Sequence, residues 1–103
     1  MRSVSVSISR FVDEHFPGFV EFILTDAVGM PHTFVDKVAI VTEANLHLES
    51  VYPQPGMLPC EIVAESSDTS GRGLVQVSTA RPCGVESTDG ASIFSVLATQ
   101  VQR

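Results

Sequence analysis

The sequence is poor in basic and large aromatic residues, and this shortage argues against whole classes of partner. It has no tryptophan, one tyrosine and six basic residues against twelve acidic ones, so its net charge is −6. Nucleic acids and anionic membranes are bound through clustered cations. The basic residues are instead scattered along the chain, as Arg2, Arg10, Lys37, Arg72, Arg81 and Arg103. We therefore expect neither a nucleic-acid nor a membrane partner, and the acidity favours solubility or a basic protein partner.

Cysteines and histidines are few and lie at uninformative spacings. The two cysteines, Cys60 and Cys83, allow at most one disulfide and do not form a C-x-x-C motif. The three histidines, His15, His32 and His47, lie near three different turns and lack the short spacings of metal ligands. The sequence therefore predicts no metal and no cofactor.

Long apolar runs are also missing. No stretch approaches the roughly 20 apolar residues of a transmembrane helix. Near the start of the chain, serines interrupt the apolar residues at every second position, which is unlike a secretory signal peptide. These absences predict a cytoplasmic location, where cysteines are kept as free thiols.

The residues that are abundant favour β-structure. The chain has 15 valines and 5 isoleucines against 6 leucines, and side chains branched at Cβ suit a pleated surface. Val4, Val6 and Ile8 alternate with serines, which is the period of a strand with one buried face. A length of 103 residues predicts one domain, residues 1–103, with a core large enough to fold alone.

Turn residues divide the chain into six strand-like stretches. We expect strands at residues 3–12, 19–27, 32–41, 57–65, 74–80 and 91–98. The periodicity of the first slips near Ser9 and Arg10, which predicts a β-bulge. The residues expected to face the core are Val4, Val6, Ile8, Leu58, Cys60, Ile62, Ala64, Val75 and Val77. The stretches at 19–27 and 32–41 have apolar residues on both faces, which predicts central or strongly curled strands. These faces are Val20, Phe22 and Leu24 against Phe19 and Ile23, and Phe34, Val38 and Ile40 against Val35, Ala39 and Val41.

The order of these stretches predicts an all-β fold. Thr42 could cap one short helix near residues 42–46. Pro53 and Pro55 exclude a regular helix or a central strand from the segment that follows. Three strands, a connection and three more strands suit a small antiparallel β-barrel or a strongly coiled sheet of five to six strands, with an OB-like or SH3-like layout.

The loops supply the candidate binding residues. The candidates for binding a partner or ligand are His47, Tyr52, Cys83, Glu86, Ser87 and Asp89. Tyr52 is the one amphipathic aromatic and lies in a proline-stiffened loop, so it either anchors a partner or folds back to close one end of the barrel. The sequence places no histidine beside Cys83 that could act as a base, and we identify no catalytic residue.

Residues 86–90 combine carboxylates and hydroxyls in a loop. They could bind a cation or the backbone amides of a partner, although their spacing is not that of an EF-hand. The alternative is that Ser87, Thr88 and Asp89 cap a turn in which Gly90 takes a positive φ.

Three short segments carry a resemblance. Residues 52–56, the pair Cys60-Glu61 and residues 81–90 resemble a group of small bacterial proteins of unknown function, and the similarity covers residues 19–97. The resemblance implies a bacterial, cytoplasmic protein. In that group an aromatic often stands where Cys83 is here, which argues against an essential thiol. It implies no activity and transfers no functional residue.

Two functions are consistent with these observations. The first is a non-enzymatic module that binds a protein through the loops at 50–56 and 81–90; an immunity-type protein that neutralises a basic toxin is one version of it. The second is a small enzyme or ligand carrier with a pocket at the barrel mouth, lined by some of His47, Tyr52, Cys83 and Glu86. The first is favoured because the sequence contains no catalytic constellation.

The first strand also bears on self-association. Residues 3–9 contain no charge and no proline, which are the usual protectors of an unpaired strand edge. We therefore expect this strand either to be paired on both sides within a closed barrel or to pair with its twin in a homodimer.

Overall fold

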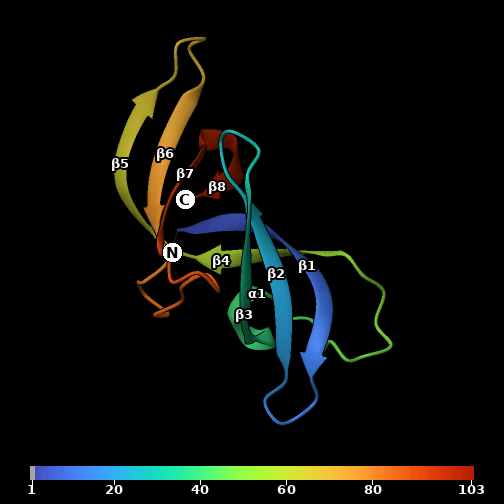
Figure 1. Cartoon of the computed structure of the whole chain (residues 1–103). Helices are drawn as coiled ribbons and strands as arrows, with labels where there is room; N and C mark the ends of the chain where they lie inside the picture. Colours follow the sequence, from blue (N-terminus) through green and yellow to red (C-terminus); the bar gives the residue numbers. More distant parts are fainter. Residues whose placement is uncertain (1) are drawn as a thin grey trace.

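The computed structural model describes residues 2–103, which are mostly strand (Figure 1). Within this range the elements are β1 (Ser3–Asp13), β2 (Phe19–Thr25), β3 (Pro31–Lys37), α1 (Val38–Val41), β4 (Gln54–Pro59), β5 (Glu61–Ser67), β6 (Gly73–Ser78), β7 (Ile93–Leu97), the 3-10 turn η1 (Ala98–Gln100) and β8 (Val101–Gln102). The β-rich fold predicted from the sequence is confirmed. The predicted number of strands, five to six, is too low.

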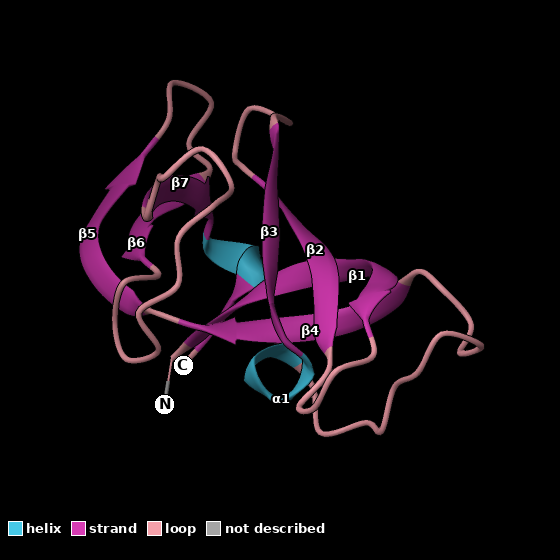
Figure 2. Cartoon of the chain, turned by 60° about the horizontal axis from the view of Figure 1, so that its bottom comes forward, coloured by secondary structure: helices cyan, strands magenta, loops and turns pink. Residues whose placement is uncertain are grey.

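The strands form two antiparallel sheets. One has the order β3-β2-β1-β4, with β8 also paired to β1, and the other has the order β5-β6-β7. Figure 2 shows the second sheet lying to one side of the first. Among the described residues no ladder joins the sheets into a closed barrel. The two sheets are connected where the chain passes from β4 to β5. Isolated hydrogen bonds, such as that from Ala27 N–H to Ser95 O (2.9 Å), also link the sheets.

The predicted strand at residues 57–65 is two strands that belong to different sheets. β4 ends at Pro59, which has no N–H to continue a ladder. Cys60 N–H donates instead to the carbonyl of Arg2 at 3.0 Å, and β5 then begins at Glu61 and pairs with β6. Leu58 and Cys60 are buried as expected, but Ala64 is exposed because β5 extends beyond the core.

The helix lies four residues earlier than predicted. It spans Val38–Val41, so the third strand ends at Lys37 and Thr42 is the C-cap instead of the N-cap. The chain turns here because Gly56 lets the Val41 carbonyl approach β4; a Cβ at Gly56 would lie 2.9 Å from that oxygen. Long-range packing therefore overrides the β-propensity of this valine-rich segment.

The core lies between the sheets and follows the predicted alternation. Val4, Val6 and Ile8 of β1 and Val75 and Val77 of β6 are buried as expected, and of the two apolar faces of β2 the one with Val20, Phe22 and Leu24 is buried. Phe34 of β3 stacks on Phe22 with ring centroids 5.1 Å apart, and it packs at a tilt on Phe94 of β7 at 5.6 Å. Phe34 therefore connects the two sheets at the centre of the core.

The bulge predicted near Ser9 and Arg10 is confirmed. The register of β1 against β2 shifts between Ile8 and Arg10. The Ser9 hydroxyl donates to Oε1 of Glu21 at 2.7 Å and the Arg10 guanidinium donates to Oε2 at 3.1 Å. The bond from Ser9 and then that from Arg10 hold the pKa of Glu21 below its usual value. One carboxylate on β2 therefore fixes the bulge in β1.

β1 is paired on both sides within the chain. One edge pairs with β4 along Ser3–Ile8, and the other pairs with β8 at Ser3 and Val4 and with β2 from Ser7 onward. The strand thus has neighbours on both sides although the ladders do not close a barrel. A homodimer through residues 3–9 is not needed to explain its pairing and stays a prediction.

Asp26 organises the turn between β2 and β3. Its Oδ1 accepts the N–H groups of Val28 (3.0 Å) and Met30 (2.9 Å), and its Oδ2 lies 2.8 Å from Nε2 of His32. Partial burial raises the pKa of this carboxyl, but the bonds from His32, Met30 and Val28 together outweigh burial and leave the pKa below 3.8. The neighbouring Ala27 N–H is the one that bonds to β7.

We expect Asp26→Ala to lower the free energy of unfolding at pH 7 by about 1–2 kcal/mol, because several donors lose their acceptor. The folded-state pKa is depressed, so this contribution is present above the unfolded value near 3.8 and is lost as the pH falls through the folded value. Urea unfolding at pH 7 and pH 3 measures both effects, with exposed Asp89→Ala as the control. Equal losses at the two pH values would contradict this role.

Candidate functional site

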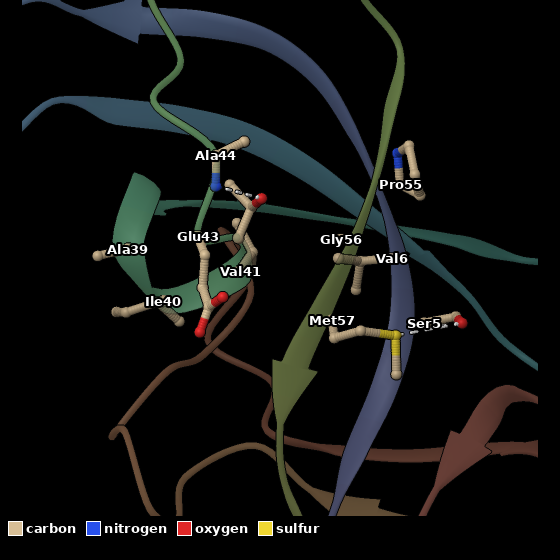
Figure 3. Close-up of a pocket in the computed structure, with 11 residues that line it drawn as sticks. Ser5, Val6, Ala39, Ile40, Val41, Glu43, Ala44, Pro55, Gly56 and Met57 are labelled. Atoms are coloured by element: carbon tan, nitrogen blue, oxygen red, sulfur yellow. Dashed lines mark hydrogen bonds between the residues drawn. The ribbon is translucent and has the colours of Figure 1, made fainter.

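The segment from α1 to Ala44 borders a hollow in the described surface. This hollow has a volume of about 550 Å³ and lies between α1 and the paired strands β1 and β4. Figure 3 shows Ile40 and Glu43 on one side of it, with Gly56 and Met57 on the other. Its floor is apolar because Val6 of β1 and Val41 of α1 are buried beneath it.

Two further hollows continue the first along the same segment. One of about 490 Å³ shares Glu43 and Ala44 with the first hollow and reaches Pro17 and Leu46. The next, of about 300 Å³, shares Pro17 and Leu46 and ends at Phe16 in the β1–β2 turn. We call the three adjoining hollows, from Met57 to Phe16, the α1 groove.

The α1 groove combines apolar and acidic side chains. Two carboxylates, Glu14 and Glu43, line it, and no lysine or arginine does so among the described residues. Glu14 and Glu43 are both exposed, so they face solvent at its rim. An apolar floor with a negative rim is complementary to an apolar side chain flanked by basic residues.

Exposed apolar residues occur in the two segments that border the last hollow, the β1–β2 turn and the loop between α1 and β4. Phe16 is 98% exposed, and in the loop between α1 and β4 Val51 is 79% and Leu48 is 53% exposed. Single exposed aliphatic residues are common, but a phenylalanine with almost no contact to its own protein is not. Aromatic side chains of this kind are typical anchors of protein interfaces.

Of the residues predicted from the sequence, His47 and Tyr52 lie together. His47 is exposed and lines the last hollow of the α1 groove. Tyr52 is half-buried against the core, and its hydroxyl donates to the His47 carbonyl at 2.7 Å. Tyr52 therefore folds back onto its own loop, but it does not close the end of a barrel as the sequence suggested, because the described strands form no closed barrel.

The other four candidates lie in the loop between β6 and β7, on the opposite side of the molecule (Figure 1). Cys83, Glu86 and Asp89 are exposed, whereas Ser87 is buried. The Ser87 hydroxyl accepts the Ala91 N–H at 3.1 Å, and Gly90 has a φ of +85°, as the turn-capping interpretation predicted. The structure does not bring this loop to His47 or Tyr52.

The two cysteines are free and have different surroundings. Cys60 is buried beside Arg2, and Cys83 is exposed. Burial raises the pKa of the Cys60 thiol, and the charge of Arg2 offsets part of this rise. The Cys60 thiol is therefore a poor nucleophile at neutral pH.

The described residues contain neither a cluster of metal-ligating side chains nor a membrane-spanning helix. Between Arg2 and Arg103 no three histidine, cysteine, aspartate or glutamate side chains are grouped so that they could hold a metal ion. No helix in the same range is long and apolar enough to cross a membrane.

Sequence reasoning missed most of the α1 groove, including Phe16, Ile40, Glu43 and Met57. One signal was available, because Phe16 directly precedes Pro17 and Gly18, a turn in which a side chain is held away from the core. The others belong to α1, its following segment and β4, which only the folded chain brings together.

Comparison of the chain with protein-family models, with curated proteins and with solved structures finds no match.

Proposed function

We propose that this protein is a non-enzymatic interaction module whose α1 groove binds a basic, partly apolar segment of another protein. The observation that carries the proposal is the row of adjoining hollows in the α1 groove, the first with an apolar floor, with Glu14 and Glu43 at the rim and Phe16 fully exposed at the end. The net charge of −6 supports the choice of a basic partner, since it speeds the approach of a cation and slows that of an anion.

An acidic immunity-type protein that neutralises a basic toxin is one specific form of this function. A cytoplasmic, bacterial setting belongs to the same proposal, and the two free thiols are in keeping with it. We further propose that the two sheets form a half-closed, OB-like arrangement. The lateral bonds Ala27 N–H to Ser95 O and Thr88 N–H to Thr33 O support this layout, because they join the open ends of the sheets.

A small-molecule carrier is the second candidate. The hollow of about 550 Å³ has the volume of an ordinary ligand pocket and an apolar floor. A carrier pocket lined by His47, Tyr52, Cys83 and Glu86 has no geometric support, because the first two belong to the α1–β4 loop and the others to the β6–β7 loop, and these loops lie on different sides of the molecule (Figures 1 and 2). Any ligand would instead lie against Ile40 and Met57.

Selection of random displayed peptides on the immobilised protein tests the main proposal. We expect the selected peptides to carry an apolar residue flanked by lysine or arginine. Amide NMR shifts on adding a selected peptide should map to Glu43, Leu46 and the Phe16 turn. Shifts confined to residues 81–90, or no selected peptide, would contradict the proposal, and a pocket that binds only small apolar probes would favour the carrier.

Two variants measure the contribution of the groove. Phe16→Ala should weaken the affinity for a selected peptide about 10–30-fold, which is the scale of an interfacial aromatic anchor. Glu43→Lys should also weaken it, and more strongly at low salt because the lost attraction is electrostatic. Glu86→Lys makes the same charge change on the opposite side and should leave the affinity within about twofold. Fluorescence polarisation titrations provide these values.

A further inference from the structure

The four lateral edges of the two sheets are not equally protected. At the outer edge of β3, Thr88 N–H donates to the Thr33 carbonyl at 2.8 Å. At the outer edge of β7, Ala27 N–H donates to the Ser95 carbonyl at 2.9 Å. β4 carries Pro55 and Pro59, and α1 packs beside it. Each of these three edges is bonded to a neighbouring segment at one residue or is interrupted by a residue without an N–H.

β5 is the exception among the described strands. It pairs with β6 on one side only, and it contains neither proline nor lysine. Figure 1 shows the β5–β6 hairpin projecting away from the rest of the molecule. The register shift at Val63 disturbs the first part of the strand, but Ala64–Ser67 continue in regular register against β6. Alternate residues there present unpaired N–H and C=O groups to solvent.

Two of the three carboxylates on this hairpin, Glu65 and Asp68, are paired within the chain, whereas Glu61 at the start of β5 forms no ion pair among the described residues. Arg103 pairs with Glu65, and Arg72 pairs with Asp68 at 2.7 Å. The charge of Arg2 also helps to hold the pKa of Glu65 down, after the stronger effects of Arg103. Half of the six basic residues of this acidic chain are therefore gathered at one hairpin. Two copies can approach here without the repulsion that their net charges of −6 create elsewhere.

We propose that β5 pairs with β5 of a second copy, antiparallel across a two-fold axis, to form one six-stranded sheet in a homodimer. A two-fold contact uses the same patch on both chains. A strand edge can therefore pair with its own copy when the register places no charged residue opposite a residue of the same charge. Registers centred on Ala64 or Ser66 place Glu65 opposite Val63 or Ser67 and not opposite its twin. This interface lies apart from the α1 groove and is independent of the function proposed for it.

Light scattering on a size-exclusion column, over a range of protein concentrations, tests the dimer. We expect the wild-type mass to approach twice the 11.1 kDa of one chain as the concentration rises. The Ala64→Lys/Ser66→Lys double variant places lysine opposite lysine in any register centred on residues 64–66. It should raise the dissociation constant at least about tenfold.

The matched control is Ile93→Lys/Ser95→Lys, which adds two lysines to the same face of the sheet on its other edge strand, β7. It should dimerise as the wild type does. Circular dichroism confirms that each variant is folded. A wild type that stays monomeric at millimolar concentration would overturn the proposal, and so would a dimer that the β5 lysines leave intact.

Hydrogen exchange on the wild type gives a test that needs no variant. Dimerisation should slow exchange of the outward amides of Ala64–Ser67 as the protein concentration rises, while exchange at the α1 groove stays constant. Concentration-dependent protection at β1 or at Phe16 with none in β5 would show that a different surface self-associates.

Discussion

Phe34→Ala is expected to lower the free energy of unfolding by about 3–5 kcal/mol, which is the scale of a phenylalanine removed from a packed core. The Phe34 ring is fully buried and stacks on Phe22 with an interplanar angle of 3°. It also contacts Phe94, which belongs to the other sheet. The substitution therefore removes contacts within one sheet and also the contact that joins the two.

Urea denaturation followed by circular dichroism measures this loss. Total stabilities of small domains are only about 5–15 kcal/mol, so the alanine variant can be largely unfolded. Phe34→Leu keeps most of the volume and should cost less than the alanine change. Val35→Ala changes the neighbouring, partly exposed residue and should cost under about 1 kcal/mol. A Phe34→Ala loss no larger than that of Val35→Ala would show that the sheets are held together elsewhere.

The position of Phe34 illustrates what the sequence could and could not predict. A period of two identified the buried faces of β1 and β6, because each of these strands has one side toward the core and one that is more exposed. Residues 32–41 have apolar residues on both faces, and one residue of each face, Phe34 and Val41, is buried. Val35 points outward, and the chain leaves the sheet after Lys37.

The predictions of the fourth strand and of the helix were wrong for a common reason, because both features depend on contacts between residues that are distant in the sequence. The change of sheet at Cys60 depends on a bond to Arg2, and the early helix depends on space above Gly56. Neither is encoded in a local period of two or 3.6. Pro59 and Gly56 were visible in the sequence, but their meaning depends on which strand lies beside them.

The candidate site was likewise predicted only in part from the sequence. Loop chemistry drew attention to His47 and Tyr52, and the structure places both in the loop at the end of the α1 groove. The residues 86–90 were equally prominent, yet Ser87 serves to cap a turn. The apolar floor was invisible because its members come from β1, α1 and β4, and each is an ordinary core or edge residue within its own segment.

Gly56→Val is expected to lower the free energy of unfolding by about 3 kcal/mol, at the upper end of the usual cost of overpacking. A Cβ at this position would lie 2.9 Å from the Val41 carbonyl oxygen and 3.0 Å from Cδ1 of Ile8. The oxygen belongs to the backbone of α1, so it can move only if the helical turn moves. The valine would therefore push α1 away from β4 and disturb the first hollow of the α1 groove.

A displacement of α1 would distinguish the clash at residue 56 from a general loss of stability. Gly56→Ala should cost less than the valine change, because it adds only the Cβ atom. Ser5→Val adds similar bulk at an exposed position on the rim of the same hollow and should change stability by under about 0.5 kcal/mol. Amide NMR shifts in the valine variant should be largest for Ala39–Glu43 and small in β5–β7. If α1 keeps its shifts while stability falls, the clash is absorbed by Ile8, and the position of α1 does not depend on the glycine.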